Sequence, residues 1–479
     1  MENLPALITF LVYSGALIGV GLWAARRAKS QSSFLIGERT LGPWVAGLAY
    51  AASSSSAWVL LGFSGFVYAV GPSALWMVPG ILAGYAAVWL WAGGVLQTAS
   101  RTQNHQTLTD FLCEDAGPRA SRLIRILASA LIAIGFSWYV AAQFQGAGQA
   151  FDDLFGTGLA QGVLIGAAIT LAYTFLGGFL AVSLIDTLQG LLIAVVAVIL
   201  PVAALIAAGG PAELAGALDT APETYTQTFG GRAGWVAAGF VTGLFATGFG
   251  ALGQPHLIAW IMAAKDTKAR VTGAGVAIGW GALVYAGMAV LGLSARALFG
   301  SDAPAEGVFF RAAADLLPGI LSGIIAAAVL SAIMSTVDSQ LLVAGGAVSH
   351  DLGLTRAFPG RDVLIARMAI LSVCAAAVLI TLLLPSSIFA RVLFAWTALG
   401  AAFGPTVVAR TLGLRPGGLA VFASILAGFA CAFLFEFILP SGPGDVWSRT
   451  LPWIAAFGAM GMVGFFERRR PVAEMGLGG

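Results

Sequence analysis

The residues of this chain that can do chemistry are polar side chains set inside long apolar runs. Four consecutive serines, Ser53–Ser56 in "AASSSSAW", lie in the middle of Leu41–Val70, a run without a single charged residue. Serine competes with the helical backbone for hydrogen bonds, and lipid penalises every backbone group left unpaired. The serine run therefore predicts a locally opened helix whose backbone oxygens are available to a ligand.

Two carboxylates lie well inside apolar runs, Asp186 in "AVSLIDTLQG" and Asp338 in "SAIMSTVDSQLL". Charges in such runs are costly and mark functional candidates. Glu436 and Asp152 stand near the ends of their runs, where they reach the interface. For Asp338, a structural pairing with another helix stays open as the alternative.

Small and hydroxyl-bearing residues surround Asp338. Ala332, Ser335 and Ser339 follow at i, i+3 and i+7 and share one helix face, which Thr336 flanks. Sodium is a hard cation and prefers carbonyl, hydroxyl and carboxylate oxygens. A helix that offers hydroxyls, beside an opened helix that offers carbonyls, predicts a sodium site. The alternative is that these hydroxyls bond back to their own helix or join helices together.

The composition is that of an integral membrane protein. Of 479 residues, 59% are hydrophobic and only 10% charged, with mean hydropathy +0.91, whereas soluble domains are about a quarter charged. The net charge of +2 comes from basic residues spread over the loops, so it predicts no nucleic-acid partner. The three cysteines fit no disulfide or metal spacing and are expected to be buried.

We predict thirteen transmembrane helices, each about 20 apolar residues long. The first lacks a basic leader and a cleavage site, so we expect it to be retained as a span. The predicted spans are Leu4–Ala24, Leu41–Val70, Ser73–Leu96, Leu123–Ala150, Leu159–Leu176, Gly178–Ala208, Gly234–Ala263, Val271–Leu298, Leu317–Ser349, Val363–Leu384, Ile388–Ala409, Gly418–Leu439 and Leu451–Phe466.

The basic residues predict the orientation of these spans. With the N-terminus outside, 19 of the 24 Lys and Arg residues fall on the inner side, as the positive-inside rule requires. We therefore expect a multi-pass protein of the cell membrane with a cytoplasmic C-terminus.

A second helix break is expected five spans after the first. "TGFGALGQPH", Thr247–His256, combines glycines with a proline, and both loosen or interrupt a helix. Two interrupted helices at corresponding positions indicate an inverted-repeat transporter with its site between the breaks. The expected division is an extra helix in 1–30, a first repeat in 41–208, a second repeat in 233–409, and two further helices with a short tail in 410–479.

Enzyme motifs are absent from the sequence: there is no P-loop, no G-x-S-x-G and no metal-spaced His/Cys cluster. We predict a protein that is not an enzyme and holds no cofactor. His256 follows the second break and either lines a pathway or packs in the core; His350 is expected at an interface.

Six stretches, in order from about residue 34 to residue 407, resemble the sodium/solute symporter family, and its sodium/proline branch in particular. They are "FLIGERTLGPWVAGLAYAAS", "TLTDFL", "TFLGGFLAVSLIDTLQG", "GALGQPHLIAW", "SAIMSTVDSQLLVAGGAVSHDL" and "FAWTALGAAFGPTVV". The resemblance implies an all-α leucine-transporter-type fold with a five-plus-five inverted repeat and sodium-driven alternating access.

The resemblance also implies the ion ligands. The main sodium site would be formed by the carbonyls of Ala52, Ser55 and Ala332 and the hydroxyls of Ser335 and Thr336. A second ion would lie near Asp186, Ser335, Asp338 and Ser339.

The substrate pocket keeps some positions of the proline branch and changes others. Trp58, Tyr139 and Pro255 match, while Ser54 replaces an acid, and Thr247 and Ala251 replace a tryptophan and a tyrosine. Gln143, four residues beyond Tyr139, would add an amide to the same face.

The predicted function is sodium-coupled import of a small organic solute, proline or a related amino acid. Proton coupling and uncoupled transport on the same fold are the alternatives, and a sensor built on this scaffold is a further one. The expected partners are the solute, Na⁺ and the lipid bilayer, with no obligate protein partner.

Overall fold

The structure is a computed structural model that describes residues 36–353, 358, 361–384, 386–439 and 445–469, with scattered residues between 8 and 23. Most of the predicted first span, Leu4–Ala24, and the tail from residue 470 lie outside the described residues. Within the described part every element is helical, and one isolated bridge pairs Leu41 with Ala264. The expected all-α membrane architecture is therefore confirmed.

The first half of the chain begins with a broken helix and continues with helices of very different lengths. The first described element is η1 (Gly37–Arg39), and the broken helix consists of α3 (Pro43–Ala57), η2 (Trp58–Phe63) and α4 (Ser64–Val70). The elements that follow are η3 (Gly71–Trp76), α5 (Met77–Ala86), η4 (Ala87–Ala92), α6 (Gly93–Thr102), α7 (Leu108–Leu112), α8 (Pro118–Phe155) and α9 (Leu159–Ala207).

The second half begins after two short helices, α10 (Pro211–Asp219) and α11 (Glu223–Thr226). Its broken helix consists of α12 (Gly234–Ala246), η5 (Thr247–Gly253) and α13 (Pro255–Ala263). The elements that follow are α14 (Thr267–Phe299), η6 (Ala305–Gly307), α15 (Val308–Leu316), α16 (Gly319–Gly346), η7 (Ala347–Asp351), α18 (Asp362–Leu383), α19 (Ile388–Thr411), α20 (Gly418–Phe437) and α21 (Val446–Arg469).

Ten stretches in the described part are long and apolar enough to cross a membrane. One of them, Pro43–Thr102, covers the second and third predicted spans, and Leu159–Ala172 is a shorter apolar helix. The predicted positions therefore carry helices throughout the described part, but the count of thirteen is not confirmed.

Both predicted helix breaks are present. Ser56 has φ 44° and ψ −179° inside α3, dihedrals that cannot continue a helical hydrogen-bond ladder. In the second half, η5 is a 3₁₀ helix rather than an α-helix. The backbone of Gln254 is then extended, directly before Pro255, the first residue of α13. A third break, at Gly178 (φ 61°), divides α9 where the predicted fifth and sixth spans meet.

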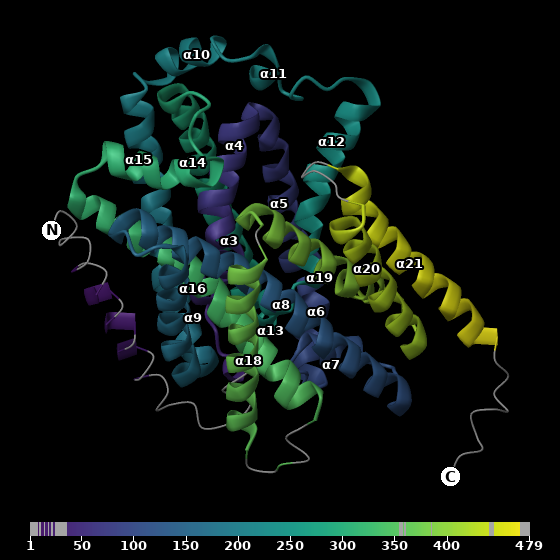
Figure 1. Ribbon diagram of the computed structural model, residues 1–479. Helices are drawn as coiled ribbons and strands as arrows, with labels where there is room; N and C mark the ends of the chain where they lie inside the picture. Colours follow the sequence, from purple (N-terminus) through teal and green to yellow (C-terminus); the bar gives the residue numbers. More distant parts are fainter. Residues whose placement is uncertain are drawn as a thin grey trace.

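The two broken helices are tied together at one end of the bundle. The N–H of Leu41, before α3, donates to the carbonyl of Ala263 (3.1 Å), and the N–H of Lys265 donates back to Leu41 (2.9 Å). The bundle of Figure 1 thus holds α3 and α13 near its centre, with α10 and α11 at one end and α20 and α21 packed together at one side.

A close backbone approach holds the second break in place. Gly84 of α5 packs against the backbone of Gly248 in η5, and Gly80 packs against Phe245 and Gly248. A Cβ atom on either α5 glycine would overlap these backbone atoms. The spacing Gly80–Gly84 therefore permits α5 to contact the opened segment directly, as glycine pairs do between membrane helices.

Candidate ion and substrate sites

Ser53 joins three helices at the first break. Its carbonyl oxygen accepts a 3.0 Å hydrogen bond from Thr336 Oγ1 of α16, and its own hydroxyl donates to Asp186 Oδ2 of α9 at 2.9 Å. All three side chains are fully buried. The predicted partners from the serine run, the Asp338 stripe and the Asp186 segment are thus brought to one place.

The hydroxyls of α16 also bond to their own helix. The carbonyl of Ala332 accepts from Ser335 Oγ (3.2 Å) and from Thr336 Oγ1 (3.1 Å), and Ser339 Oγ donates to the carbonyls of Ser335 (3.1 Å) and Thr336 (2.9 Å). Back-bonding and bonding between helices, which sequence reasoning kept as alternatives to an ion site, both occur here. Thr336 does both at once.

The remaining predicted ion ligands lie close to Ser53 in the chain. Ala52 and Ser55 are fully buried on α3, and Ser55 Oγ donates to the carbonyl of Ala51 (2.8 Å). Asp186 Oδ1 is buried and has no hydrogen-bond partner among the described residues. Asp338 is fully buried on α16, two residues beyond Thr336.

Gln143 of α8 stabilises the opened turn. Its Oε1 accepts a 2.9 Å hydrogen bond from the backbone N–H of Ala57, directly after the break, while the N–H of Trp58 donates to Ser56 Oγ (3.1 Å). Backbone donors that lose helical partners must find others when buried. Gln143, predicted as a substrate ligand, therefore caps the break.

A cavity of about 320 Å³ lies beside the two breaks. Four predicted substrate residues, Ser54, Trp58, Tyr139 and Thr247, line it. Gln143, Ala251 and Pro255 are not among its lining residues, and Pro255 lines a separate cavity of about 410 Å³. Six lining residues were not predicted: Ile81, Tyr85, Tyr285, Val392, Leu393 and Trp396.

The lining of the 320 Å³ cavity contains no charged residue. Its polar atoms are mostly engaged: Ser54 and Tyr85 share a hydrogen bond between their hydroxyls, and Trp396 Nε1 donates to the carbonyl of Thr247 (2.8 Å). Trp58 Nε1 is buried and has no hydrogen-bond partner among the described residues. The cavity thus has aromatic walls and one N–H donor, Trp58 Nε1, that has no hydrogen-bond partner among the described residues.

His256 packs against aromatic rings. Its ring meets the rings of Phe136 and Tyr139 edge-on, with centroids 5.3 Å and 6.2 Å apart. His256 is therefore packed in the core, but neither of its ring nitrogens has a hydrogen-bond partner among the described residues.

The family model for the sodium:solute symporter family matches residues 34–412, most of the chain. The chain belongs to the sodium:solute symporter family. Among its curated relatives, the sodium/proline symporter of Escherichia coli (strain K12) is 30% identical over 88% of this chain and 86% of its own. The sodium/proline symporter of Haemophilus influenzae is 29% identical over 95% and 92%.

Solved structures show the same fold at low sequence identity. A Na⁺-coupled sialic acid symporter in a substrate-bound outward-open state matches with a TM-score of 0.82 at 15% identity, covering 97% of this chain and 98% of its own. A nucleobase-cation-symport-1 family transporter matches with a TM-score of 0.58, also at 15% identity, over 94% and 98%. The expected leucine-transporter-type fold is confirmed, and the symporter moves a small solute together with sodium across the membrane.

Proposed function

We propose that this symporter imports proline or a closely related small amino acid with sodium by alternating access. The observation that carries the proposal is the hydrogen bond from Thr336 to the carbonyl of Ser53, which joins the opened helix α3 to the unbroken helix α16. The similarity to sodium/proline symporters over most of the chain supports the choice of substrate. The protein would lie in the cell membrane with its N-terminus outside and its C-terminus in the cytoplasm.

Sodium would bind where Thr336 meets the opened turn. The proposed ligands are the carbonyls of Ala52, Ser55 and Ala332 and the hydroxyls of Ser335 and Thr336. Oxygens of these kinds suit a hard cation. An ion held there would bridge α3 to α16, and its release on the inner side would free the two helices to separate. Sodium and substrate transport are coupled if both ligands stabilise the same conformation of the protein, because each ligand then raises the affinity for the other.

A second ion would occupy the neighbourhood of Asp186, Asp338 and Ser339. Asp186 is fully buried on α9, and its Oδ1 has no hydrogen-bond partner among the described residues, so this carboxylate needs a nearby cation or a proton. Asp338 is also fully buried, on α16. Sodium and a proton are both compatible with this chemistry, and the experiment below distinguishes the two coupling ions.

The 320 Å³ cavity supports a small zwitterionic substrate. Aromatic side chains dominate its lining, and the free space between them is small. A ligand with net charge would be buried there without a protein counter-charge, which is costly, whereas an amino acid is neutral overall. Trp58 Nε1 would donate to the carboxylate, and the surrounding rings would attract the ammonium group. Gln143, Ala251 and Pro255 do not line the cavity; they would support the residues that do.

The energetics permit concentrative uptake with one ion. Sodium that enters down a potential of about 100 mV gains roughly 2.3 kcal/mol, and a tenfold gradient adds about 1.4 kcal/mol. Together these sustain a solute gradient of about several hundredfold.

Uptake of labelled proline into proteoliposomes tests the proposal. We expect accumulation with an inward sodium gradient, none when potassium replaces sodium, and a collapse in Ser335→Ala. Ser372→Ala, which removes an exposed back-bonded hydroxyl on α18, is the matched control and should retain uptake. Uptake driven by a pH gradient without sodium would establish proton coupling instead. A sodium-induced thermal shift without a response to proline would keep the ion site and reject the substrate.

A further inference from the structure

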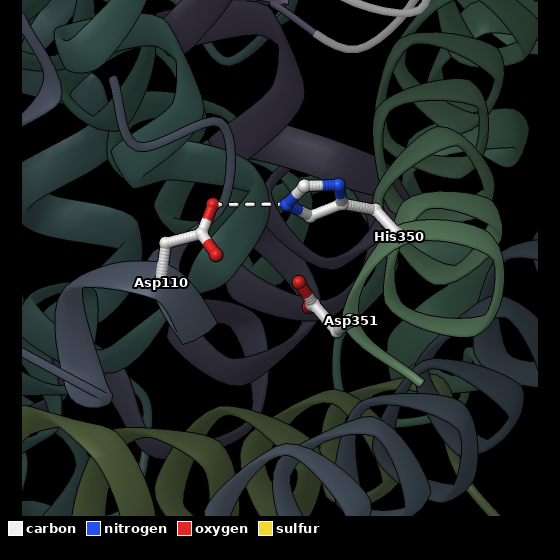
Figure 2. Close-up of side chains that lie close together, drawn as sticks. All are labelled: Asp110, His350 and Asp351. Atoms are coloured by element: carbon white, nitrogen blue, oxygen red, sulfur yellow. Dashed lines mark hydrogen bonds and ion pairs between the residues drawn. The ribbon is translucent and has the colours of Figure 1, made fainter. Parts of the chain in front are cut away.

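A cluster of charged side chains lies where α7, α8 and η7 meet. His350 Nε2 lies 3.1 Å from Asp110 Oδ2, and Asp351 lies beside them, as Figure 2 shows. Arg125 Nη2 is 2.9 Å from Asp110 Oδ1, and Arg125 Nη1 is 3.5 Å from Asp351 Oδ1. Thr107 Oγ1 donates to Asp351 Oδ1 at 2.8 Å. The network joins α7, α8 and η7, and η7 directly continues the ion-site helix α16.

Asp110, His350 and Asp351 are close enough together to hold a metal ion. However, the guanidinium of Arg125 already pairs with both carboxylates. A cation in that position supplies the charge that a metal would supply. The cluster is therefore an ion-pair network between helices.

This network separates two cavities. The cavity of about 410 Å³ is lined mostly by buried residues and has Pro255, Met262 and Leu342 on its walls. The cavity of about 1190 Å³ is lined by exposed residues of α8 and by Asp110, Arg125 and His350. Asp351 lines both cavities. Pro255, next to the second break, thus lines the first cavity, and Asp351 of the network lies where the two cavities meet.

We propose that Asp110, Arg125, His350 and Asp351 form the inner gate of the symporter, and that the charge on His350 controls how readily it opens. The inference rests on the proposed function, because a gate has a meaning only if the substrate leaves on this side. Opening would separate α7 and α8 from η7 and so break the pairs to Asp110 and Asp351. A protonated His350 adds an attraction to Asp110 that a neutral His350 lacks.

The groups that face His350 fix the sign of the pH effect. In the described part these are Asp110 from α7, Asp351 from its own turn, and Arg125 and Arg122 from α8. Burial raises the pKa of Asp110, but the hydrogen bond and charge of His350, the N–H of Gln106 and the charge of Arg125 outweigh burial and hold that pKa well below its usual range. Asp110 therefore stays ionised near neutral pH. Raising the pH neutralises His350, which removes its attraction to Asp110 and so weakens the contact between η7 and α7.

Cysteine labelling tests the gate without requiring transport. In a background with Cys113, Cys374 and Cys431 replaced by alanine, Ala259→Cys places a thiol on the wall of the 410 Å³ cavity. Ile126→Cys places a reference thiol in the 1190 Å³ cavity. A membrane-impermeant maleimide is applied to inside-out and right-side-out vesicles without sodium or substrate. The reference thiol identifies the vesicles in which the reagent meets the cluster.

We expect Asp110→Asn and His350→Gln each to raise the labelling rate at Ala259→Cys, relative to Ile126→Cys, about fivefold or more at about pH 6. In the parent protein this ratio should rise from about pH 6 to about pH 8, and His350→Gln should abolish the rise. Asp315→Asn, which removes the partner of Arg311 in an exposed pair (3.7 Å) on α15, is the matched control and should leave the labelling ratio unchanged.

Unchanged labelling in both variants, or a pH dependence that persists in His350→Gln, would overturn the gate. Proline uptake is measured separately, so a failure of the substrate assignment is distinguished from a failure of the gate.

Discussion

Thr336 donates a hydrogen bond to the carbonyl of Ser53, 283 residues earlier in the chain. The donor lies on the regular helix α16 and the acceptor lies three residues before the break at Ser56. The same Ser53 donates its hydroxyl to Asp186. One residue of the serine run thus links the opened helix to both carboxylate-bearing helices, which is the arrangement that ion-dependent coupling between α3 and α16 requires.

Thr336→Val should weaken sodium activation of uptake. The substitution keeps the side-chain shape but removes the hydroxyl that reaches Ser53, and a lost hydrogen bond or ion ligand at a buried site costs about 1–3 kcal/mol. We expect the sodium concentration for half-maximal uptake to rise by about tenfold or more. Thr170→Val is the matched control, because Thr170 is buried but bonds only within α9, to Gly166 (2.9 Å). Equal sodium activation in the two variants would contradict the site.

The helix breaks and the buried carboxylates could be predicted from sequence because their signals are local. Four serines in an uncharged run and the Thr247–His256 tract mark helix breaks by composition alone, and Asp186 and Asp338 stand out as charges in apolar surroundings. What local signals could not supply was the partner of each oxygen. The sequence does not single out Ser53 among the four serines, because only the packing of α16 against α3 shows which serine carbonyl meets Thr336.

The lining of the 320 Å³ cavity was only partly predictable, for a different reason. Tyr85, Tyr285 and Trp396 lie on α5, α14 and α19, in long apolar stretches where aromatic residues are common and carry no distinguishing pattern. They meet only in the folded bundle. Trp396 also occupies space near Thr247, where the proline branch has an aromatic side chain of its own. The change at Thr247 was visible in the sequence, and the neighbouring ring was not.

Trp58→Phe should impair substrate binding while it leaves sodium binding intact. The substitution keeps an aromatic ring stacked on Phe389, 5.7 Å away between centroids, but removes the uncommitted Nε1 donor. Loss of a hydrogen bond to a charged group costs about 1.5–3 kcal/mol, so we expect the KM for proline to rise by about tenfold or more. Trp91→Phe, on an exposed tryptophan, is the control for uptake. A normal KM in Trp58→Phe, with sodium-induced thermal shifts equal to the parent, would show that Nε1 does not contact substrate.

Gln143→Leu should destabilise the first break, whereas Gln340→Leu should not. Gln143 accepts the N–H of Ala57, and its removal leaves that buried donor unpaired. The free energy of unfolding should fall by about 1–3 kcal/mol. Gln340 is equally buried, but neither of its amide atoms has a hydrogen-bond partner among the described residues, so an apolar replacement loses no bond there. Thermal unfolding of the two variants in detergent gives the comparison, and an equal loss in both would mean that Gln143 does not cap the break.

Asp110→Asn should lower stability near neutral pH and lose this effect in acid. The pKa of Asp110 in the folded protein is held below its usual value by His350, Gln106 and Arg125, which outweigh the opposing effect of burial. A carboxylate with a depressed folded-state pKa stabilises the fold above its unfolded pKa, and that contribution disappears as the pH falls through the folded value. We therefore expect the Tm of Asp110→Asn to lie below that of the parent at about pH 6, with the difference closing as the pH falls below about 3.9. Asp315→Asn, at an exposed pair, serves as the control and should show no such convergence. A Tm difference that stayed constant into acid would mean that the asparagine acts through packing rather than through the lost charge, and would separate Asp110 from the electrostatic network around η7.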